Sequence, residues 1–392
     1  MNQQLTPCEE TLMVRSSRRQ LTIGIPAEDP NEETRTPLTP QGVEVLTAKG
    51  HTVLMQKGAG LPSRFSDEQY ALAGATMTDC RRQTLKADLV LKVSPPTEDD
   101  AAQMGPEPTV ACLTGRHARG KEAFRRLAAQ KATIIATDAM TDSPGAEPAL
   151  AKSLGEMEGQ MAIATAARLL EATGGGKGVI VGGVTGVPPT EVVIIGSGMA
   201  ALTAARTADA LGAYVKVFDS SHNGLQSLST GLTHHIFTSV MHPQAITKAL
   251  RSADVVVGTR ACCQDDGCYI PDEYLSLLKH EAVIVDLDTT NGGRTEASRP
   301  TTLAQPAYRH GNIIFHCLPD ITVLAPHTAT IVMSDILTPL ISILADEGST
   351  ASAARFRPRV QSAIAMYKGY ATNRDLARKS GLEHLDIKLL LI

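Results

Sequence analysis

Several features that define large classes of proteins are absent from this sequence. Tryptophan does not occur, and aromatic residues make up only 3% of the 392 residues, so we expect a core of aliphatic side chains. No apolar run reaches the roughly 18 residues of a membrane-spanning helix, and the nearest, ATIVMSDILTPLISIL, contains Ser, Asp and Thr. The N-terminal segment MNQQLTPCEETLMVRSSRRQ has no apolar stretch of the secretory type. We therefore predict a cytoplasmic protein with no membrane partner.

The sequence also lacks a large excess of either charge. It has 37 Lys and Arg against 41 Asp and Glu, a net charge of −4, and no basic block with interleaved aromatic residues, so nucleic-acid binding is not expected. Seven cysteines, an odd number spread along a long chain, are typical of reduced thiols. Cys262, Cys263 and Cys268 are clustered, but their spacing is not that of a zinc site, and no metal site is predicted.

Apolar strand-like segments alternate with helix-like segments along the whole chain. LTIGIPA (21–27) and DLVLKVSPP (88–96) are typical of buried strands, and a second series begins at TEVVIIG. This alternation favours parallel α/β sheets, and the length favours about two domains. We predict two Rossmann-like domains with parallel sheets. A nucleotide-binding domain, residues 151–326, is expected to be inserted into a discontinuous substrate domain made of residues 1–150 and 327–392.

The strongest motif is TEVVIIGSGMAALTAARTADALGAYVKVFD (190–219). An apolar strand leads into a G-x-G-x-x-A turn that opens a helix, and a second strand ends on an acidic residue. The first glycine allows the tight turn, the second lets the backbone approach a pyrophosphate, and the small alanine allows close packing of helix and strand. The expected cofactor contacts of this motif are Gly196, Ser197, Gly198, Met199, Ala200, Ala201 and Asp219.

Asp219 indicates which dinucleotide is bound. It follows the glycine turn by about 20 residues, where a carboxylate accepts hydrogen bonds from the ribose hydroxyls. The next residues, SSHN, contain no arginine that would hold a 2′-phosphate. NAD is therefore the predicted cofactor.

Five separated motifs share one resemblance. They are IGIPAEDPNEETRTPLTP, AKGHTVLMQKGAG, LVLKVSPP, the segment from GKGVIVGG to KVFD, and GGRTEASRPTT. Together they resemble the alanine dehydrogenase and transhydrogenase alpha-subunit family, and alanine dehydrogenase in particular, over roughly residues 21–392. The resemblance implies a substrate domain split around an NAD-binding domain, usually in a homo-oligomer. It also implies oxidation of L-alanine by NAD, giving pyruvate and ammonia.

Two cations stand where the family binds its substrate. Arg35, in EETRTPLTP, matches the arginine that holds the substrate carboxylate, and a planar guanidinium can grip a carboxylate through two hydrogen bonds. Lys92, in LVLKVSPP, matches the lysine that contacts a substrate oxygen and acts in catalysis. A lysine at the end of a buried strand is costly unless it meets an anion.

The proton-transfer positions depart from the family. The catalytic histidine of the relatives aligns with Gly115, and His117 lies two residues further on, where it serves either as the proton carrier or as a surface residue between arginines. Relatives carry IDQGG where this chain has TTNGG, so Thr290 replaces their aspartate. Asp288, two residues earlier, would present a carboxylate on the same face if the strand continued, and we predict that it is catalytic.

Other residues are expected beside the cofactor, and among them Asp320 replaces an asparagine that relatives place next to the nicotinamide. The predicted set is Ser239, Thr259, Leu287, Thr290 and Asp320. The altered positions leave two further hypotheses open. One is an enzyme that acts on another amino acid, imine or keto acid, and the other is an NAD-binding relative without catalysis.

Overall fold

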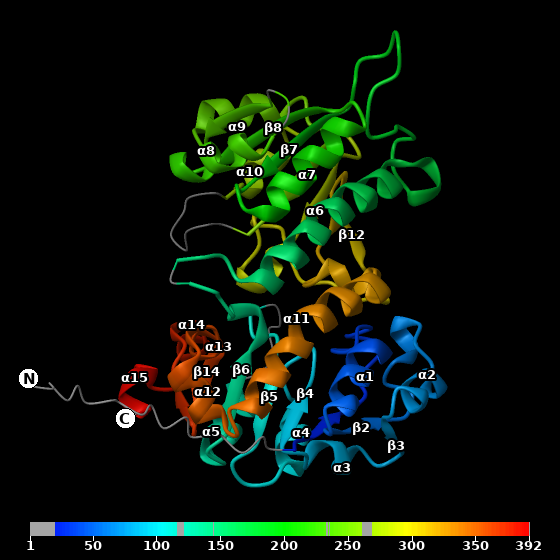
Figure 1. Cartoon of the computed structure of the whole chain (residues 1–392). Helices are drawn as coiled ribbons and strands as arrows, with labels where there is room; N and C mark the ends of the chain where they lie inside the picture. The colour runs from blue at the N-terminus through cyan, green and yellow to red at the C-terminus, as the bar shows by residue number, and fades with distance from the viewer. Residues whose placement is uncertain are drawn as a thin grey trace, which may run out of the picture.

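The computed structural model describes residues 20–391 except 116–120, 144, 233, 235 and 261–268. Two β-sheets, each covered by helices, form two lobes that are connected by long helices (Figure 1). Most strands in both sheets are parallel, as the alternation of strand and helix predicts. The predicted α/β architecture is therefore confirmed.

The first sheet has eight strands in the order β15-β14-β6-β5-β4-β1-β2-β3. Their bounds are β1 (Thr22–Ile25), β2 (Thr52–Gln56), β3 (Thr76–Thr78), β4 (Leu89–Leu91), β5 (Thr109–Cys112), β6 (Thr133–Ala136), β14 (Ile364–Tyr367) and β15 (Tyr370–Ala371). The strands β1 to β6 pair in parallel, while β14 pairs antiparallel with both β6 and β15. The C-terminal part of the chain thus returns to the first sheet.

The second sheet has seven strands in the order β12-β13-β11-β10-β7-β8-β9. Their bounds are β7 (Glu191–Ile195), β8 (Tyr214–Asp219), β9 (Phe237–Val240), β10 (Val255–Gly258), β11 (Val283–Asp286), β12 (Ala307–His310) and β13 (Ile313–His316). β12 pairs antiparallel with β13, and the other strand pairs described in this sheet are parallel. Because helices cover both faces, the central strands β7, β10 and β11 are almost completely buried and read as continuous apolar runs.

Helices of the first lobe begin at recognisable signals. Thr39 caps the first of them with its side chain, Pro40 follows, and Ser66 and Gln69 form a capping box at the second. The helices of this lobe before the second sheet are α1 (Pro40–Ala48), α2 (Asp67–Leu72), α3 (Arg81–Leu85), α4 (Glu98–Gln103) and α5 (Lys121–Ala129). Those after it are α12 (Thr350–Phe356), α13 (Pro358–Ala363), α14 (Arg374–Ser380) and α15 (Ile387–Leu390).

Two long helices, α6 (Ala149–Leu170) and α11 (Pro326–Asp346), run between the lobes (Figure 1). In the second lobe, α6 packs closely on α7 (Met199–Ala210), and the other helices there are α8 (His222–Gly231), α9 (Pro243–Leu250) and α10 (Asp272–Leu275). A side chain at Gly159 of α6 would lie 2.1 Å from Thr203 Oγ1 and 2.3 Å from the Ala200 carbonyl oxygen. The close approach of α6 to the start of α7 therefore depends on this glycine.

One helix of the described chain, α11, is long and apolar enough to cross a membrane by length and composition. However, 61% of its most apolar window is buried inside the molecule. Met333, Leu337, Leu340 and Ile341 of α11 belong to the apolar core of the first lobe. In this structure α11 is therefore a core helix.

The order of the strands confirms that the second sheet is inserted into the first lobe, because β14 and β15 follow it in sequence but join β6. The predicted boundary after residue 150 falls within α6, and the boundary after residue 326 falls at the start of α11. Those boundaries remain predictions.

Candidate functional site

The glycine-rich motif forms the turn between β7 and α7. β7 ends at Ile195, and Gly198 is the N-cap of α7. β8 and β9 lie on one side of β7, whereas β10, β11 and β13 lie on the other. The strand order therefore reverses between β7 and β10. In open parallel sheets, ligands bind at such a point, outside the carboxyl ends of the strands.

The geometry of this turn requires glycine at its first position. Gly196 has φ +109°, and a Cβ there would lie 2.2 Å from Thr259 Oγ1. The Thr259 hydroxyl is fully buried at the end of β10 and donates to the Ile195 carbonyl over 2.9 Å. At Gly198, by contrast, the nearest described atom to an added Cβ is the Arg260 carbonyl oxygen, 4.0 Å away. Open space therefore adjoins the N-terminus of α7, where unpaired N–H groups favour an anion.

Asp219 lies at the end of β8, next to this turn. It is 2% exposed, and its Oδ1 accepts a hydrogen bond from the Ser221 backbone N–H over 2.7 Å. Its Oδ2 is buried and has no hydrogen-bond partner among the described residues. A buried carboxylate oxygen without a donor is destabilising, and ribose hydroxyls would provide donors there. The turn, the helix N-terminus and Asp219 together fit an adenine dinucleotide.

The remaining predicted cofactor residues separate into two groups. Ser239 pairs with Phe218 beside Asp219, Leu287 is buried directly after β11, and Ala200 and Ala201 are buried in the first turn of α7. These residues lie at the same edge of the second sheet as the glycine turn. Thr290 and Asp320 lie elsewhere, in the short helical turns η4 (Thr289–Asn291) and just before η5 (Ile321–Leu324).

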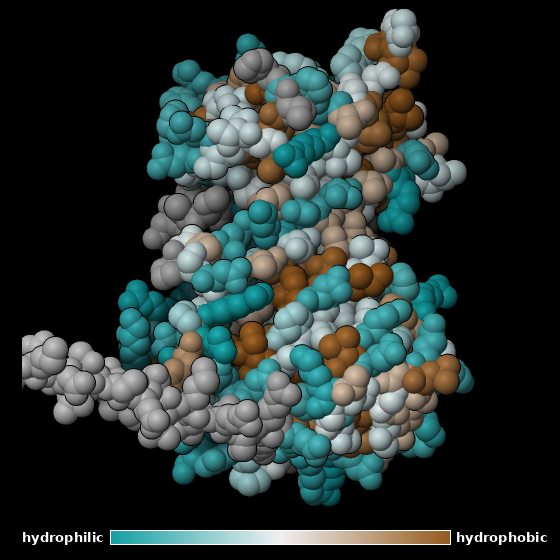
Figure 2. Space-filling view, in the orientation of Figure 1, coloured by the Kyte–Doolittle hydropathy of each residue, from teal (hydrophilic) through white to brown (hydrophobic). Residues whose placement is uncertain are grey.

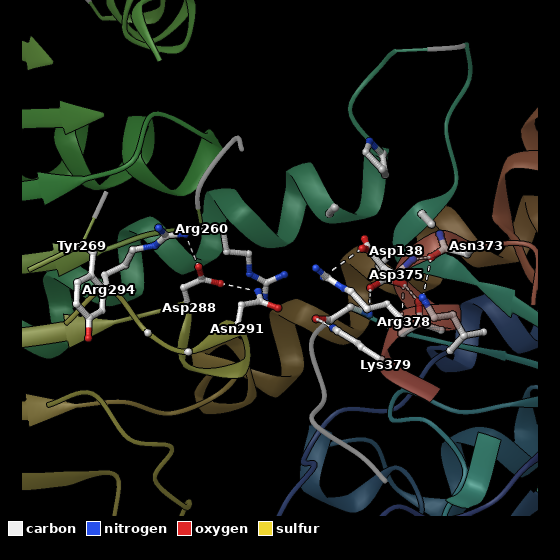
Figure 3. Close-up of a pocket in the computed structure, with 18 residues that line it drawn as sticks. Asp138, Arg260, Tyr269, Asp288, Asn291, Arg294, Asn373, Asp375, Arg378 and Lys379 are labelled. Carbon is white, nitrogen blue, oxygen red and sulfur yellow. Dashed lines mark hydrogen bonds and ion pairs between the residues drawn. The ribbon is translucent and has the colours of Figure 1, made fainter. Parts of the chain in front are cut away.

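A cleft of about 660 Å³ lies between the lobes. Its walls come from the ends of β5, β6, β10 and β11, from the start of α6, and from α14 (Figure 3). The charged residues that line it are Asp138, Arg260, Asp288, Arg294, Asp375, Arg378 and Lys379. The Arg260 carbonyl oxygen would be 3.3 Å from a Cβ on Gly196, so the cleft adjoins the dinucleotide turn.

Asp288 lies on the wall of this cleft, as its predicted role requires. Its Oδ2 accepts a hydrogen bond from Arg294 Nη2 at 2.5 Å, and its Oδ1 accepts one from Asn291 Nδ2 at 2.7 Å. The strand does not continue to residue 290, however, because β11 ends at Asp286 and a 3-10 turn follows. The expected strand relation between Asp288 and Thr290 is therefore wrong, although the Asp288 carboxylate still reaches the cleft.

Asp286, the last residue of β11 and two residues before Asp288, has a structural role. It is fully buried and accepts hydrogen bonds from the backbone N–H groups of Arg294 (2.6 Å) and Asp288 (2.9 Å) and from Ser298 Oγ (2.5 Å). Burial raises the pKa of Asp286 above its usual value, against the effect of these hydrogen bonds. Asp286 therefore fixes the loop that carries Asp288 and Arg294.

Arg35 and Asp320, predicted separately for substrate and cofactor, are bonded to each other. Arg35 Nη1 donates to Asp320 Oδ2 at 2.9 Å, while Nε and Nη2 each donate to the Glu33 carboxylate at 2.7 Å. The Arg35 side chain is completely buried. Burial opposes its charge, but Asp320 and Glu33 raise the pKa of Arg35 above its ordinary value. The predicted substrate cation is thus enclosed by two carboxylates.

Lys92 has a similar environment. Its Nζ lies 2.8 Å from Glu28 Oε2 and 3.3 Å from Asp100 Oδ2, and its side chain is 1% exposed. Burial would raise the pKa of Glu28, but the Lys92 charge and hydrogen bonds from Lys92, Ser94 and Val93 hold it below its usual value. The catalytic and substrate-binding roles of Lys92 remain a prediction, and so does the role of Arg35.

Gly115, which has no side chain, stands at the position of the family's histidine. Gly115 donates its N–H to Asp138 Oδ2 at 2.7 Å, and its carbonyl oxygen is 3.5 Å from Lys379 Nζ. Burial and the nearby charges of Arg260 and Arg378 lower the pKa of Lys379, against Asp375 and Asp138. His117 lies outside the described residues. So do Cys262, Cys263 and Cys268, and no group of metal ligands occurs among the residues that are described.

Sequence reasoning missed the residues that converge on the cleft from distant segments. Arg260 follows β10, Asp138 follows β6, and Lys379 belongs to α14. None lies in a recognisable motif, and only the juxtaposition of the two lobes brings them together. Arg260 and Asp138 follow the ends of parallel strands, where ligands often bind, so their sequence positions alone could have indicated a site. Lys379, in a helix, had no such indication.

The reversal of strand order, the glycine turn and the interlobe cleft define the class of protein: a two-domain dinucleotide-binding oxidoreductase. Residues 24–156 match the family model "Alanine dehydrogenase/PNT, N-terminal domain", and residues 162–374 match "Alanine dehydrogenase/PNT, C-terminal domain". The chain belongs to the alanine dehydrogenase/PNT family. This confirms the resemblance, and with it the expected NAD-dependent oxidoreductase class.

Relatives of known name match over most of the chain. An alanine dehydrogenase of Mycolicibacterium smegmatis is 34% identical over 359 residues, 90% of this chain and 93% of the relative. That of Bacillus subtilis is 31% identical, covering 93% and 96%. A solved L-alanine dehydrogenase has a TM-score of 0.81 at 27% identity, covering 91% of this chain and 98% of the other. A transhydrogenase from Sinorhizobium meliloti, with a TM-score of 0.72 at 20% identity over 90% of this chain and 99% of the other, shares the fold.

Asp219→Ala is expected to raise the Kd for NADH by about 10- to 100-fold, because it removes hydrogen bonds from the ribose to a charged acceptor. Discrimination against NADPH should fall at the same time, since a 2′-phosphate would no longer meet a carboxylate. Fluorescence titration with both reduced cofactors measures these changes. Glu44→Ala, an exposed carboxylate on α1, is the control. Equal NADH affinity in Asp219→Ala and the parent protein would contradict the assignment.

Proposed function

We propose that this chain catalyses the NAD-dependent oxidative deamination of L-alanine to pyruvate and ammonia, and the reverse reaction. The observation that carries the proposal is the position of Asp288. Its carboxylate is fixed by Arg294 and Asn291 in the cleft, and that cleft adjoins the glycine turn of the dinucleotide motif. A small amino acid in this cleft would lie between a proton acceptor and the cofactor.

The cofactor and the chain contribute different parts of the reaction. NAD, when bound, accepts a hydride from the substrate α-carbon. Asp288 accepts a proton from the substrate amino group and releases it to solvent. It then accepts a proton from the water that attacks the oxidised carbon and returns that proton to the nitrogen that leaves as ammonia, a role for which an oriented carboxylate is suited. Arg294 and Asn291 orient Asp288, and the Asp286 network holds the loop that carries all three.

Three predicted residues keep more limited roles in this proposal. Arg35 and Lys92 are each paired with two carboxylates, and neither is among the residues that line the cleft, so their predicted contacts with the substrate remain proposals. His117 remains the predicted proton carrier at the histidine position of the family. Gly115 itself has no titratable group.

A second candidate function is the dehydrogenation of a different amino acid. Gly115 and Thr290 favour it, because they stand where the family has its proton-transfer residues. Steady-state assays of NADH formation with a panel of L-amino acids, and of NADH consumption with 2-oxo acids and ammonia, distinguish the two functions. The first requires the highest kcat/KM for L-alanine and pyruvate. A higher value for another pair would favour the second.

We also propose a homo-oligomer. Ile180, Val184 and Val187 are 56%, 56% and 61% exposed on an arm that extends from the second lobe. Figure 2 shows hydrophobic side chains gathered on this arm at the upper right. Apolar side chains on a protruding arm favour burial against another copy. The expected cytoplasmic location stays a prediction.

A further inference from the structure

The cleft contains a guanidinium, that of Arg260, two of whose nitrogens have no hydrogen-bond partner within the described part of the chain. Arg260 lies directly after Thr259, at the carboxyl end of β10. Its Nε and Nη2 are buried without a hydrogen-bond partner among the described residues, while 29% of the side chain remains exposed. Glu158 Oε1 forms an ion pair with Nη2 at 3.6 Å, beyond hydrogen-bond distance. Two buried donor nitrogens of Arg260 therefore lack the acceptor that burial normally requires, and a ligand carboxylate could supply it.

The surroundings of Arg260 keep it charged. Burial opposes the charge, but Glu158, followed by Asp320, Asp288 and Asp138, raises the pKa of Arg260 above its ordinary value. Figure 3 shows Arg260 on the same side of the cleft as Asp288 and Asn291, facing Asp138, Arg378 and Lys379. A charged fork with carboxylates nearby complements a molecule that carries both a carboxylate and an amino group.

Arg35 does not have donors available in the same way. Its Nε and Nη2 donate to Glu33, and Nη1 donates to both Asp320 Oδ2 and Thr322 Oγ1. These bonds use four of the five N–H groups of a guanidinium. A carboxylate could be gripped through two hydrogen bonds only if Glu33 or Asp320 were displaced.

We propose that Arg260, and not Arg35, receives the substrate carboxylate, with the substrate amino group toward Asp288. This inference rests on the proposed function, because it assigns a position to the substrate of that reaction. Arg260 belongs to the nucleotide-binding lobe, and its carbonyl oxygen adjoins the Gly196 turn. The substrate would thus be anchored by the same lobe that holds the cofactor. Arg260 would select 2-amino and 2-oxo acids over their amides.

The test measures binding without turnover. The complex of protein and NADH is titrated with oxamate, which carries a carboxylate, and with oxamide, its neutral counterpart, by calorimetry. The parent protein is expected to prefer oxamate. Arg260→Gln should weaken oxamate binding by about 10- to 100-fold, the worth of charge-assisted hydrogen bonds, and leave oxamide binding unchanged. Arg251→Gln, an exposed arginine after α9, is the matched control and should keep the preference.

A second variant and a second arginine keep the test decisive. Arg260→Lys retains a point charge but lacks the planar fork, so it should keep part of the preference for oxamate. Arg35→Gln should keep the preference if it folds. The proposal is overturned if Arg260→Gln and Arg260→Lys both bind oxamate as the parent does, or if their main defect is in NADH binding, which would indicate a pyrophosphate ligand.

Failure of the proposed function has a different signature. A parent protein that prefers oxamate through Arg260 but does not oxidise L-alanine would retain the Arg260 assignment and refute the reaction. A parent that oxidises L-alanine while Arg260→Gln keeps the KM for L-alanine would refute Arg260 and retain the reaction. A parent that shows no preference for oxamate over oxamide overturns the inference directly.

Discussion

Replacing Asp288 by Asn is expected to lower kcat for L-alanine oxidation by about 100- to 10,000-fold, the usual contribution of a positioned acid or base. Asparagine has nearly the same shape and can still accept a hydrogen bond from Arg294 or Asn291, but it cannot accept a proton. The Kd for NADH should therefore change little. Stopped-flow measurement of NADH formation, together with fluorescence titration of NADH, separates the two effects.

Asp335→Asn, on the exposed face of α11, is the control for the loss of one negative charge. The melting temperature of Asp288→Asn is measured in parallel, because Asp288 also pairs with the largely buried Arg294. A variant that remains folded, binds NADH and retains more than about a tenth of the parent kcat would show that Asp288 is not the proton acceptor.

Gly196→Ala is expected to weaken NADH binding by about 10- to 100-fold. The residue has φ +109°, where a side chain costs about 1–3 kcal/mol, and the added Cβ would lie 2.2 Å from Thr259 Oγ1. The turn would have to move, and the N-terminus of α7 would move with it. Isothermal titration of NADH measures the loss.

Gly105→Ala is the matched control, because its Cβ would meet no atom within 4 Å and its backbone isn't in the left-handed region. Combining Gly196→Ala with Thr259→Ala removes the colliding hydroxyl but leaves the backbone strain. The double variant should therefore recover part of the affinity. Undiminished NADH binding by Gly196→Ala would mean that the cofactor does not use this turn.

The sequence could predict the parts of the site that are local. The residues from Gly196 to Ala201 and Asp219 lie within one strand-helix-strand unit, so spacing alone places them at one edge of a sheet. The insertion of one domain into the other was predictable for a related reason. The second series of alternating strands and helices begins after the first series and ends before the C-terminal helical segment. In both cases, the geometry follows from neighbouring residues.

The pairings across the chain were not predictable in this way. Arg35 and Asp320 are 285 residues apart in sequence, and each matches a separate family position. Nothing in either motif indicates that an aspartate at position 320 would bond to the arginine and compete with a substrate carboxylate. Arg260 could not be recognised from the sequence either. Its burial, its unpartnered nitrogens and the carboxylates around it, Glu158, Asp288 and Asp138, depend on segments that are far apart in the chain.

The loop after β11 illustrates an intermediate case. The carboxylate at Asp288 was expected in the site, and it lies in the cleft. The expected reason, a continued strand, was wrong because the chain turns into a 3-10 helix after Asp288. Asn291 and Arg294 then become its hydrogen-bond donors, a consequence of the turn that strand periodicity does not predict.

A family member with Gly115 and Thr290 at the altered positions is expected to oxidise L-alanine still. The most direct measurement is the absorbance of NADH after the purified protein is mixed with NAD and L-alanine across a series of alkaline pH values, with pyruvate identified in the product. NADH and pyruvate are expected in equal amounts. Protein that binds NADH but forms neither product at any of these pH values would contradict it.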